Sequence, residues 1–183
     1  MKTACVLLAD GFEEVEALTP VDYLRRAGIE VTSVGIAGRT AVGARGIKVE
    51  ADAGPEGLSR DYDCVIVPGG GKGSANLAAS AAVASLIKRH FGAGKTVAAI
   101  CAAPAVVLHG ACGILAGRRF TCFPGLEKDV KGASFSDERV VVDGNLITSR
   151  AAGTAGEFAR AVIAALSGKA KADEIARSVL LKD

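Results

Sequence analysis

Short apolar runs alternate with segments of helical periodicity along most of this 183-residue chain. Runs such as CVLLA and CVIVP are apolar at consecutive positions, which is typical of strands buried on both faces of a parallel sheet. Asp143-Gly144 stands between the runs ERVVV and LITS and favours a tight hairpin there. The apolar runs predict strands at Thr3–Ala9, Glu30–Ile36, Asp63–Pro68, Thr96–Ile100, Arg119–Cys122, Arg139–Asp143 and Leu146–Ser149.

Segments with helical spacing fill most of the gaps between these strands. They predict helices near Glu13–Ala27, Ala75–Leu77, Ala81–His90, Ala102–Gly110, Gly153–Leu166 and Ala170–Ser178. Strands that alternate with helices build a parallel sheet covered on both faces. The sequence contains no linker, repeat or low-complexity stretch, and we therefore expect a single α/β domain over residues 1–183 with a doubly wound, mostly parallel sheet.

Composition and charge exclude several classes of protein. The net charge is only +2, and no basic patch is interleaved with aromatic residues, which argues against nucleic acid as the primary partner. The apolar run before Asp10 is too short for a signal peptide or a membrane span, so we expect a cytoplasmic protein without a membrane partner. Five cysteines without CxxC spacing and only two histidines favour free thiols over a disulfide framework or a metal site.

The most informative segment is TVAAICAAPAVVLHG, residues 96–110, in which a short strand stops at Cys101 and a helix follows at once. Open α/β sheets place their binding crevices at the carboxyl ends of strands. The alanines around Cys101 allow a sharp turn that presents a nucleophile, and Pro104 suits a first helical turn. The amino end of a helix also favours a thiolate. We predict that Cys101 is a reactive cysteine.

Two other loops leave strand ends and should meet Cys101 in one crevice. The loop PGGGKGSANL, residues 68–77, can point backbone N–H groups into a site, but it lacks the spacing of a phosphate-binding or dinucleotide-binding loop, and a simple tight turn is its alternative reading. The loop DGFEEVEA, residues 10–17, contributes Glu16 between apolar neighbours. A carboxyl desolvated against Cys101 would have a raised pKa and would stay protonated, donating to the sulfur. Complementing the helix dipole from a wet surface is the alternative role of Glu16.

Neither histidine is positioned to activate Cys101. His90 precedes the strand that ends at Cys101 and should lie about 15–20 Å away, at ~3.3 Å per residue. His109 lies further along the same helix, roughly 12 Å from Cys101 by helical rise. A cysteine–histidine protease dyad therefore fails unless a partner chain supplies the histidine.

The chain carries, in this order, the segments GFEEVEALTPVDYLRRAG, DCVIVPGG, AAICAAPAVVL, LITSRAAGTAGEFA and VLLKD. Together they resemble the ThiJ/PfpI superfamily, in particular its parkinsonism-linked DJ-one branch, from Thr3 to Asp183. The resemblance implies a flavodoxin-like sandwich, with helices on both faces of the sheet, and a homodimer. The first predicted helix also favours a dimer, because it is apolar on more than one face.

The resemblance implies roles for several residues. Cys101 matches the reactive cysteine of the family, and Glu16 matches its protonated glutamate partner. The backbone amides of Gly70 and Ala102 match oxyanion-type donors.

Three further residues are implied at or near the substrate. Arg45 matches a basic residue that the partner subunit holds near the pocket, and Arg150 falls near the site. Phe123 stands where some members of the branch carry a histidine, which puts a third catalytic side chain in doubt. Its neighbour Cys122 is either packed in the core or a second redox-sensitive thiol.

Different functions remain open on these residues. As an enzyme, the protein would use Cys101 to attack methylglyoxal, glyoxal or their early adducts on amines or thiols. Glu16 would then move protons, and water would release the hydroxy acid without a cofactor. As a redox sensor or chaperone-like stress protein, it would instead accumulate Cys101 as a sulfinate. A peptidase or amidase is disfavoured by the missing histidine, and a purely structural role is the remaining alternative.

Overall fold

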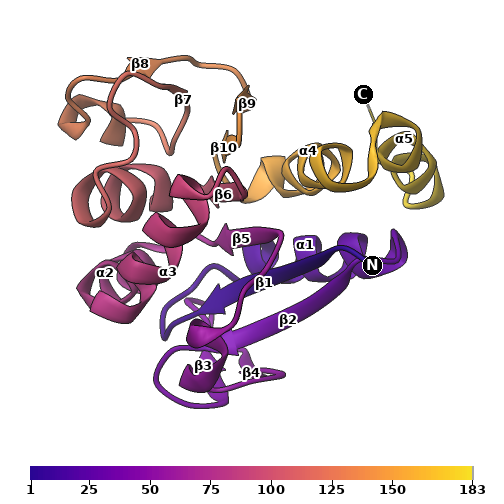
Figure 1. Ribbon diagram of the computed structural model, residues 1–183, viewed down its shortest axis with the longest axis horizontal. Coiled ribbons are helices and arrows are strands. Elements are labelled where there is room, and N and C mark those ends of the chain that lie inside the picture. Colours follow the sequence, from indigo (N-terminus) through magenta and orange to yellow (C-terminus); the bar gives the residue numbers. More distant parts are fainter. Residues whose placement is uncertain (183) are drawn as a thin grey trace.

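The computed structural model describes residues 1–182 and has a six-stranded sheet at its centre (Figure 1). The strand order is β2-β1-β5-β6-β10-β9, with β9 antiparallel to β10 at one edge and parallel pairing elsewhere. These strands are β1 (Thr3–Leu8), β2 (Glu30–Gly35), β5 (Cys64–Val67), β6 (Thr96–Ile100), β9 (Val140–Asp143) and β10 (Leu146–Ser149). The flavodoxin-like α/β fold and the hairpin at Asp143-Gly144 are confirmed.

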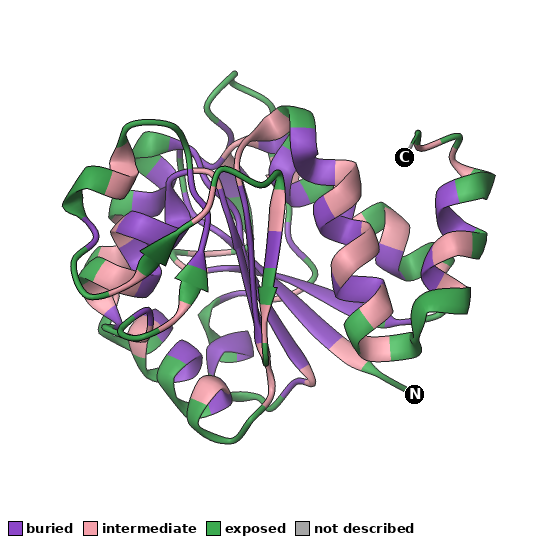
Figure 2. Ribbon diagram, turned by 90° about the horizontal axis from the view of Figure 1, so that it is seen from above, coloured by how far each residue is buried: buried purple, intermediate pink, exposed green. Residues whose placement is uncertain are grey.

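Helices cover both faces of this sheet, and Figure 2 shows the buried strands between them. One side carries α1 (Glu14–Arg26), α4 (Ala155–Ser167) and α5 (Lys169–Ser178), and the other carries α2 (Gly71–Ala79), α3 (Ala81–Gly92) and a π-helical segment, Pro104–Ala111. Val6 of β1 belongs to the core cluster of Leu24 and Phe158, whereas its neighbour Leu7 belongs to that of Leu86. Alternate strand residues point to opposite faces, so burial of both faces explains why β1 is apolar throughout.

The strand predicted at Arg119–Cys122 is largely wrong. Only β7 (Arg119–Phe120) is extended, and it pairs with β8 (Ser134–Phe135) in a separate two-stranded sheet. The reason lies just after Phe120, where the N–H of Thr121 donates to Thr148 Oγ1 at 2.9 Å and the N–H of Phe123 donates to the Cys101 carbonyl at 2.8 Å. These bonds turn the chain across the end of the sheet instead of along it.

Two other elements depart from the sequence analysis. The hairpin of β3 (Thr40–Val42) and β4 (Lys48–Glu50) was not predicted, because each strand has only three residues. Helix α2 is longer than predicted, since its glycines suggested a loop. Gly73 is needed inside that helix because a Cβ there would lie 2.6 Å from the backbone nitrogen of Phe12. The structure also contains three short 3-10 helices, at Pro55–Ser59, Leu126–Asp129 and Ala152–Thr154.

No helix within residues 1–182 combines the length and apolar character needed to cross a bilayer.

Candidate active site

Cys101 occupies a strained turn directly after β6. Its φ is 65°, in the left-handed region that costs an L-residue about 1–2 kcal/mol. Its backbone N–H donates to the Ser149 carbonyl at 2.9 Å, and its carbonyl accepts from the Phe123 N–H at 2.8 Å. Pro104 begins the following helical segment, as predicted, and the thiol is half-buried. The turn therefore presents the sulfur at the carboxyl end of the sheet.

Glu16 lies against this thiol from the first turn of α1. It has no exposed surface, and its Oε2 accepts the N–H of Gly69 at 3.0 Å. A Cβ at Gly69 would lie 2.5 Å from Cys101 Cβ and 2.5 Å from Glu16 Oε2, so the absence of a side chain lets the two groups meet. Glu16 Oε1 has no hydrogen bond of ordinary geometry among residues 1–182. That oxygen is therefore available to exchange a proton with the site.

Burial governs the electrostatics of the pair. Removal from water raises the pKa of Glu16 to about 7, although contact with the Cys101 thiol and a backbone hydrogen bond oppose the rise. Burial also raises the pKa of Cys101 to about 12, and the charge of Glu16 adds to it, while the N–H groups of Gly70 and Ala102 lower it. The two titrations are coupled, so between these values the pair holds one proton. The N–H of Ala102 favours the thiolate, as expected at the amino end of a helix, but burial outweighs its effect on the pKa of Cys101.

The glycine loop brings its backbone to the sulfur. Gly70 has a φ of 88°, and a Cβ there would lie 2.3 Å from the Gly11 carbonyl oxygen. Glycine is therefore required at this position, and its N–H, together with that of Ala102, acts on the Cys101 thiol. These are the two amides expected to act as oxyanion donors, and that role stays a prediction.

Arg45 extends from the loop between β3 and β4 toward the start of α1. Its backbone N–H donates to Glu14 Oε1 at 2.7 Å, and its guanidinium lies 3.6 Å from Glu13 Oε2. The Arg45 side chain is 74% exposed, so most of it faces outward. Its proposed place near the pocket of a partner subunit stays a prediction.

Phe123 and Arg150 flank Cys101 through the backbone. Phe123 donates its N–H to Cys101 and leaves its ring exposed, and Arg150 directly follows Ser149, the acceptor of the Cys101 N–H. The Arg150 guanidinium lies 5.8 Å from the centre of the Phe135 ring. Both residues thus lie next to the Cys101 turn along the backbone, and their contact with substrate stays a prediction.

His90 and four of the cysteines belong to the fold. The buried ring of His90 accepts the Tyr62 N–H at 3.0 Å and contacts the Leu86 carbonyl at 2.8 Å, so both ring nitrogens are committed away from Cys101. Cys122 has no exposed surface, which favours packing in the core over the alternative of a redox-sensitive thiol. The other buried cysteines are Cys5, Cys64 and Cys112. Within residues 1–182, no three histidine, cysteine or acidic side chains converge as metal ligands would.

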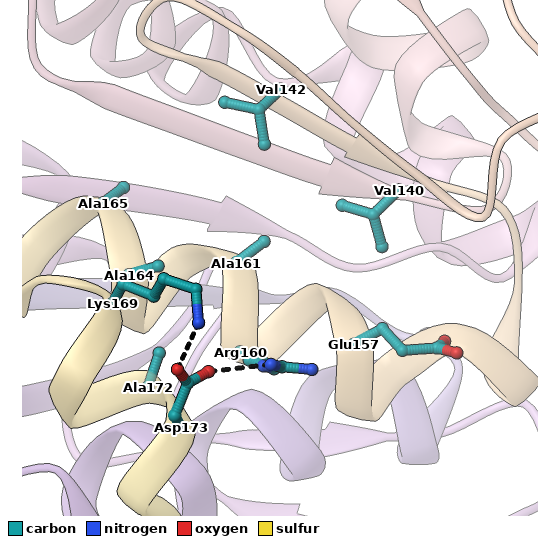
Figure 3. A pocket seen from close by; sticks show the side chains of 10 residues that line it. All are labelled: Val140, Val142, Glu157, Arg160, Ala161, Ala164, Ala165, Lys169, Ala172 and Asp173. Atoms are coloured by element: carbon teal, nitrogen blue, oxygen red, sulfur yellow. Dashed lines mark hydrogen bonds and ion pairs between the residues drawn. The ribbon is translucent and has the colours of Figure 1, made fainter. Parts of the chain in front are cut away.

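A cavity of about 410 Å³ lies elsewhere, between β9, α4 and α5 (Figure 3). Its walls combine alanines and the valines Val140 and Val142 with four charged residues. Among the charged residues, Lys169 and Arg160 both bond to Asp173. None of the predicted site residues lines it. The nucleophile and its partners thus lie outside this cavity, at the strand ends.

Two contributors to the geometry escaped the sequence analysis. Gly69 was named only as part of a glycine run, although its place directly after β5 was a usable signal. Ser149 lies almost fifty positions from Cys101 in the chain and reaches it because β10 pairs with β6. No local pattern marks that residue.

Comparison with known proteins places these residues in a family context. The family profile described as DJ-1/PfpI family matches residues 2–165. The protein dj-1beta of Drosophila melanogaster is 40% identical over 184 residues, covering 98% of this chain and 97% of that protein. A protein of Pyrococcus abyssi named as a deglycase is 34% identical over 151 residues, covering 81% of this chain and 89% of that protein. The crystal structure of a mutant DJ-1 superfamily protein from Salmonella typhimurium has a TM-score of 0.95 and 41% identity, covering 100% of both chains.

Proposed function

This chain belongs to the DJ-1/PfpI family, and from that premise we propose that it is a cofactor-independent enzyme acting on α-oxoaldehydes. Its substrates are methylglyoxal or glyoxal, free or as early adducts on amines and thiols, and its product is the hydroxy acid. The observation that carries the proposal is the pairing of a half-buried nucleophile in a strained turn, Cys101, with a fully buried carboxyl, Glu16. The similarity to a protein named as a deglycase supports the substrate class.

The first step forms a hemithioacetal. Glu16 takes the thiol proton as the Cys101 sulfur bonds to the aldehyde carbon. The sulfur can therefore attack as a thiolate although burial raises the pKa of the thiol. The carbonyl π electrons move to oxygen, and the N–H groups of Gly70 and Ala102 stabilise the resulting oxyanion. Return of the proton from Glu16 to that oxygen completes the neutral adduct.

The second step is an internal redox reaction. Glu16 removes the proton from the former aldehyde carbon to give an enediol, and the proton is returned to the neighbouring carbon. The aldehyde carbon is thereby oxidised to a thioester while the ketone carbon is reduced to an alcohol, so no external oxidant is needed. Water then hydrolyses the thioester, releasing lactate and restoring the Cys101 thiol.

Lactate formation from methylglyoxal tests the proposal. The wild-type protein and a Cys112→Ser control, which changes a thiol buried away from Glu16, are expected to form lactate. Cys101→Ser is expected to form none, and Glu16→Gln is expected to form it far more slowly. Lactate should be followed directly, because loss of aldehyde alone can reflect simple thiol trapping. Consumption of aldehyde by the wild type without lactate would overturn the enzymatic proposal. Oxidation of Cys101 to the sulfinate would then be the function to measure.

We also propose that the protein acts as a homodimer through α1 and the β3–β4 hairpin. Val15, Leu18 and Ile47 are 50%, 37% and 54% exposed, and they line a groove of about 370 Å³ on this face. Clustered exposed apolar side chains mark interaction surfaces. Val15→Asp with Leu18→Asp is expected to convert a dimer to a monomer in sedimentation velocity. Val142→Asp, at an apolar position of β9 that is 52% exposed, is the matched control, and an unchanged dimer in the double variant would contradict the assignment.

A further inference from the structure

The strained backbone of Cys101 is held from two sides. Its N–H is bound by the Ser149 carbonyl of β10, and its carbonyl is bound by the Phe123 N–H. A residue at a φ of 65° stays there only when its surroundings impose that conformation. The position of the sulfur therefore depends on what fixes these two partners.

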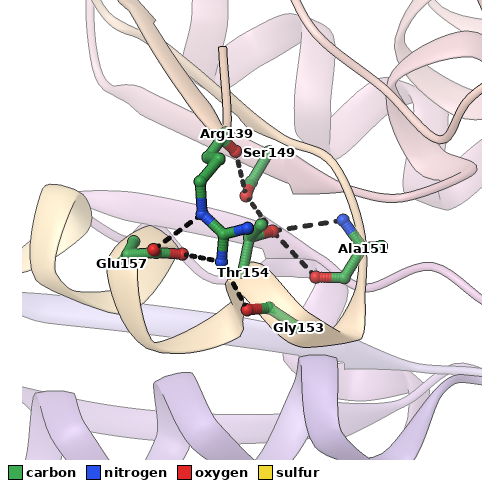
Figure 4. Close-up of polar contacts among 6 residues, drawn as sticks. All are labelled: Arg139, Ser149, Ala151, Gly153, Thr154 and Glu157. Atoms are coloured by element: carbon green, nitrogen blue, oxygen red, sulfur yellow. Dashed lines mark hydrogen bonds and ion pairs between the residues drawn. The ribbon is translucent and has the colours of Figure 1, made fainter. Parts of the chain in front are cut away.

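A buried group of hydroxyls fixes the Ser149 side of this arrangement (Figure 4). Ser149 Oγ donates to the Arg139 carbonyl at 2.8 Å and lies 2.7 Å from Thr154 Oγ1. Thr154 Oγ1 in turn accepts the Ala151 N–H at 3.1 Å, and its single proton is shared between Ser149 Oγ and the Ala151 carbonyl, which lies 2.8 Å away. Ser149 is fully buried and Thr154 is 4% exposed. The two hydroxyls thus link the end of β10 to the residue just before β9 and to the turn that leads into α4.

The side chain of Arg139 adds hydrogen bonds to the same network. Its guanidinium donates to the Gly153 carbonyl at 2.7 Å and to both carboxylate oxygens of Glu157. The side chain of Arg139 therefore links the residue before β9 to the first turn of α4 and to the 3-10 helix before it. Thr148, one residue before Ser149, accepts the Thr121 N–H and so anchors the loop that carries the other partner of Cys101.

We propose that Ser149 and Thr154 are positioning residues for the nucleophile. Their hydroxyls fix the Ser149 carbonyl, which holds the Cys101 N–H and keeps the sulfur between Glu16 and the two amide donors. If the hydroxyls are removed, the strained turn is free to relax, and the thiol moves away from the donors. The inference rests on the proposed function for its turnover readout only, because the reactivity of Cys101 can be measured without any turnover.

The experiment uses Thr154→Val, which keeps the shape of the side chain and removes the hydroxyl, beside Thr154→Ser, which keeps the hydroxyl. Alkylation of Cys101 by iodoacetamide is followed by peptide mass spectrometry across pH. Thr154→Val is expected to react about tenfold more slowly at neutral pH and to show a higher apparent thiol pKa. Thr154→Ser is expected to restore the wild-type profile. In turnover, the Thr154→Val variant should lose kcat with little change in KM.

Ser33→Ala is the matched control, because Ser33 is a hydrogen-bonded, buried hydroxyl on β2, at the other edge of the same sheet. It should be destabilised without any change in Cys101 alkylation. The proposal would be overturned if Cys101 of Thr154→Val were alkylated at the wild-type rate, or if Ser33→Ala slowed the alkylation of Cys101 as much as Thr154→Val does. If Thr154→Val does not fold, Ser149→Ala decides by the same readout. If the wild-type protein formed no lactate, the proposed function would be contradicted. The positioning role would still be decided by comparing the rates of Cys101 alkylation in the wild type and in Thr154→Val.

Discussion

Replacing Gly69 with alanine is expected to lower the rate of lactate formation by about 100-fold or more while the fold is retained. The added Cβ would lie 2.5 Å from Cys101 Cβ, 2.5 Å from Glu16 Oε2 and 2.9 Å from the Ile100 carbonyl oxygen. Contacts this short must be relieved, and the Glu16 carboxylate is the end of a side chain and moves most readily. It would then lose its hydrogen bond with the Gly69 N–H and its place beside the thiol. Lactate formation and the circular dichroism spectrum measure the two parts of this expectation.

Gly71→Ala is the matched control for this prediction. Gly71 lies two positions further along the same loop, begins α2, and has nothing within 4 Å of an added Cβ. Alanine also favours the helix over glycine by up to about 1 kcal/mol, so the control should be at least as stable as the wild type. Wild-type activity in Gly69→Ala would show that the close packing of Cys101 and Glu16 is not needed for turnover.

The parts of the fold that follow a local rule could be predicted from the sequence. Consecutive apolar positions in β1 and β5 indicated a sheet covered on both faces, and Asp143-Gly144 indicated the hairpin at its edge. The prediction failed where a contact distant in the chain overrides the local pattern. Thr121 has the β-branched side chain of a strand residue, yet its N–H bonds to Thr148 and turns the chain away.

The candidate site, too, could be predicted from the sequence only where a local pattern marks the residue. Cys101 could be located because the transition from strand to helix is visible in the sequence, and Glu16 because an acidic residue stands among apolar neighbours. The part played by Gly69 could not be predicted, since it depends on the side chains of Glu16 in α1 and of Cys101 in the turn after β6 meeting beside it. The net shift in the pKa of Cys101 could not be predicted for a related reason: the sequence shows the helix end but not the depth of burial or the nearby charge of Glu16.

Glu16→Gln is expected to reduce lactate formation by about 10²–10⁴-fold, the range typical of a lost general base. Glutamine keeps the size of the side chain but cannot take the thiol proton. In the wild type, kcat/KM should rise with pH toward a plateau above pH 7, because the pKa of Glu16 is raised to about 7 by burial. In Glu16→Gln this rise should disappear. A rise near pH 7 that survives in the variant would show that another group supplies the base.

The Glu16→Gln substitution should lower activity but raise the free energy of unfolding at alkaline pH. The pKa of Glu16 is raised from 4.5 to about 7 in the native state, so over this range the native protein binds more protons than the unfolded chain. The stabilisation from the protonated carboxyl is complete below pH 4.5 and is lost as the pH rises through 7. Glutamine mimics the protonated form at every pH. Glu16→Gln should therefore exceed the wild type in free energy of unfolding at pH 8, by roughly 1–3 kcal/mol.

Glu13→Gln separates the role of Glu16 from a general effect of removing acidic charge. The Glu13 carboxylate contributes to the raised pKa of Glu16, although burial is the main cause. Without that charge, the rise in kcat/KM should shift to lower pH while the plateau is kept. If Glu16 is the base, this shift must occur, because the pKa of Glu16 sets the pH at which kcat/KM rises. If Glu13→Gln instead lowered the plateau as far as Glu16→Gln does, the acidic cluster as a whole would be acting, and the assignment of the proton to one carboxyl would be wrong.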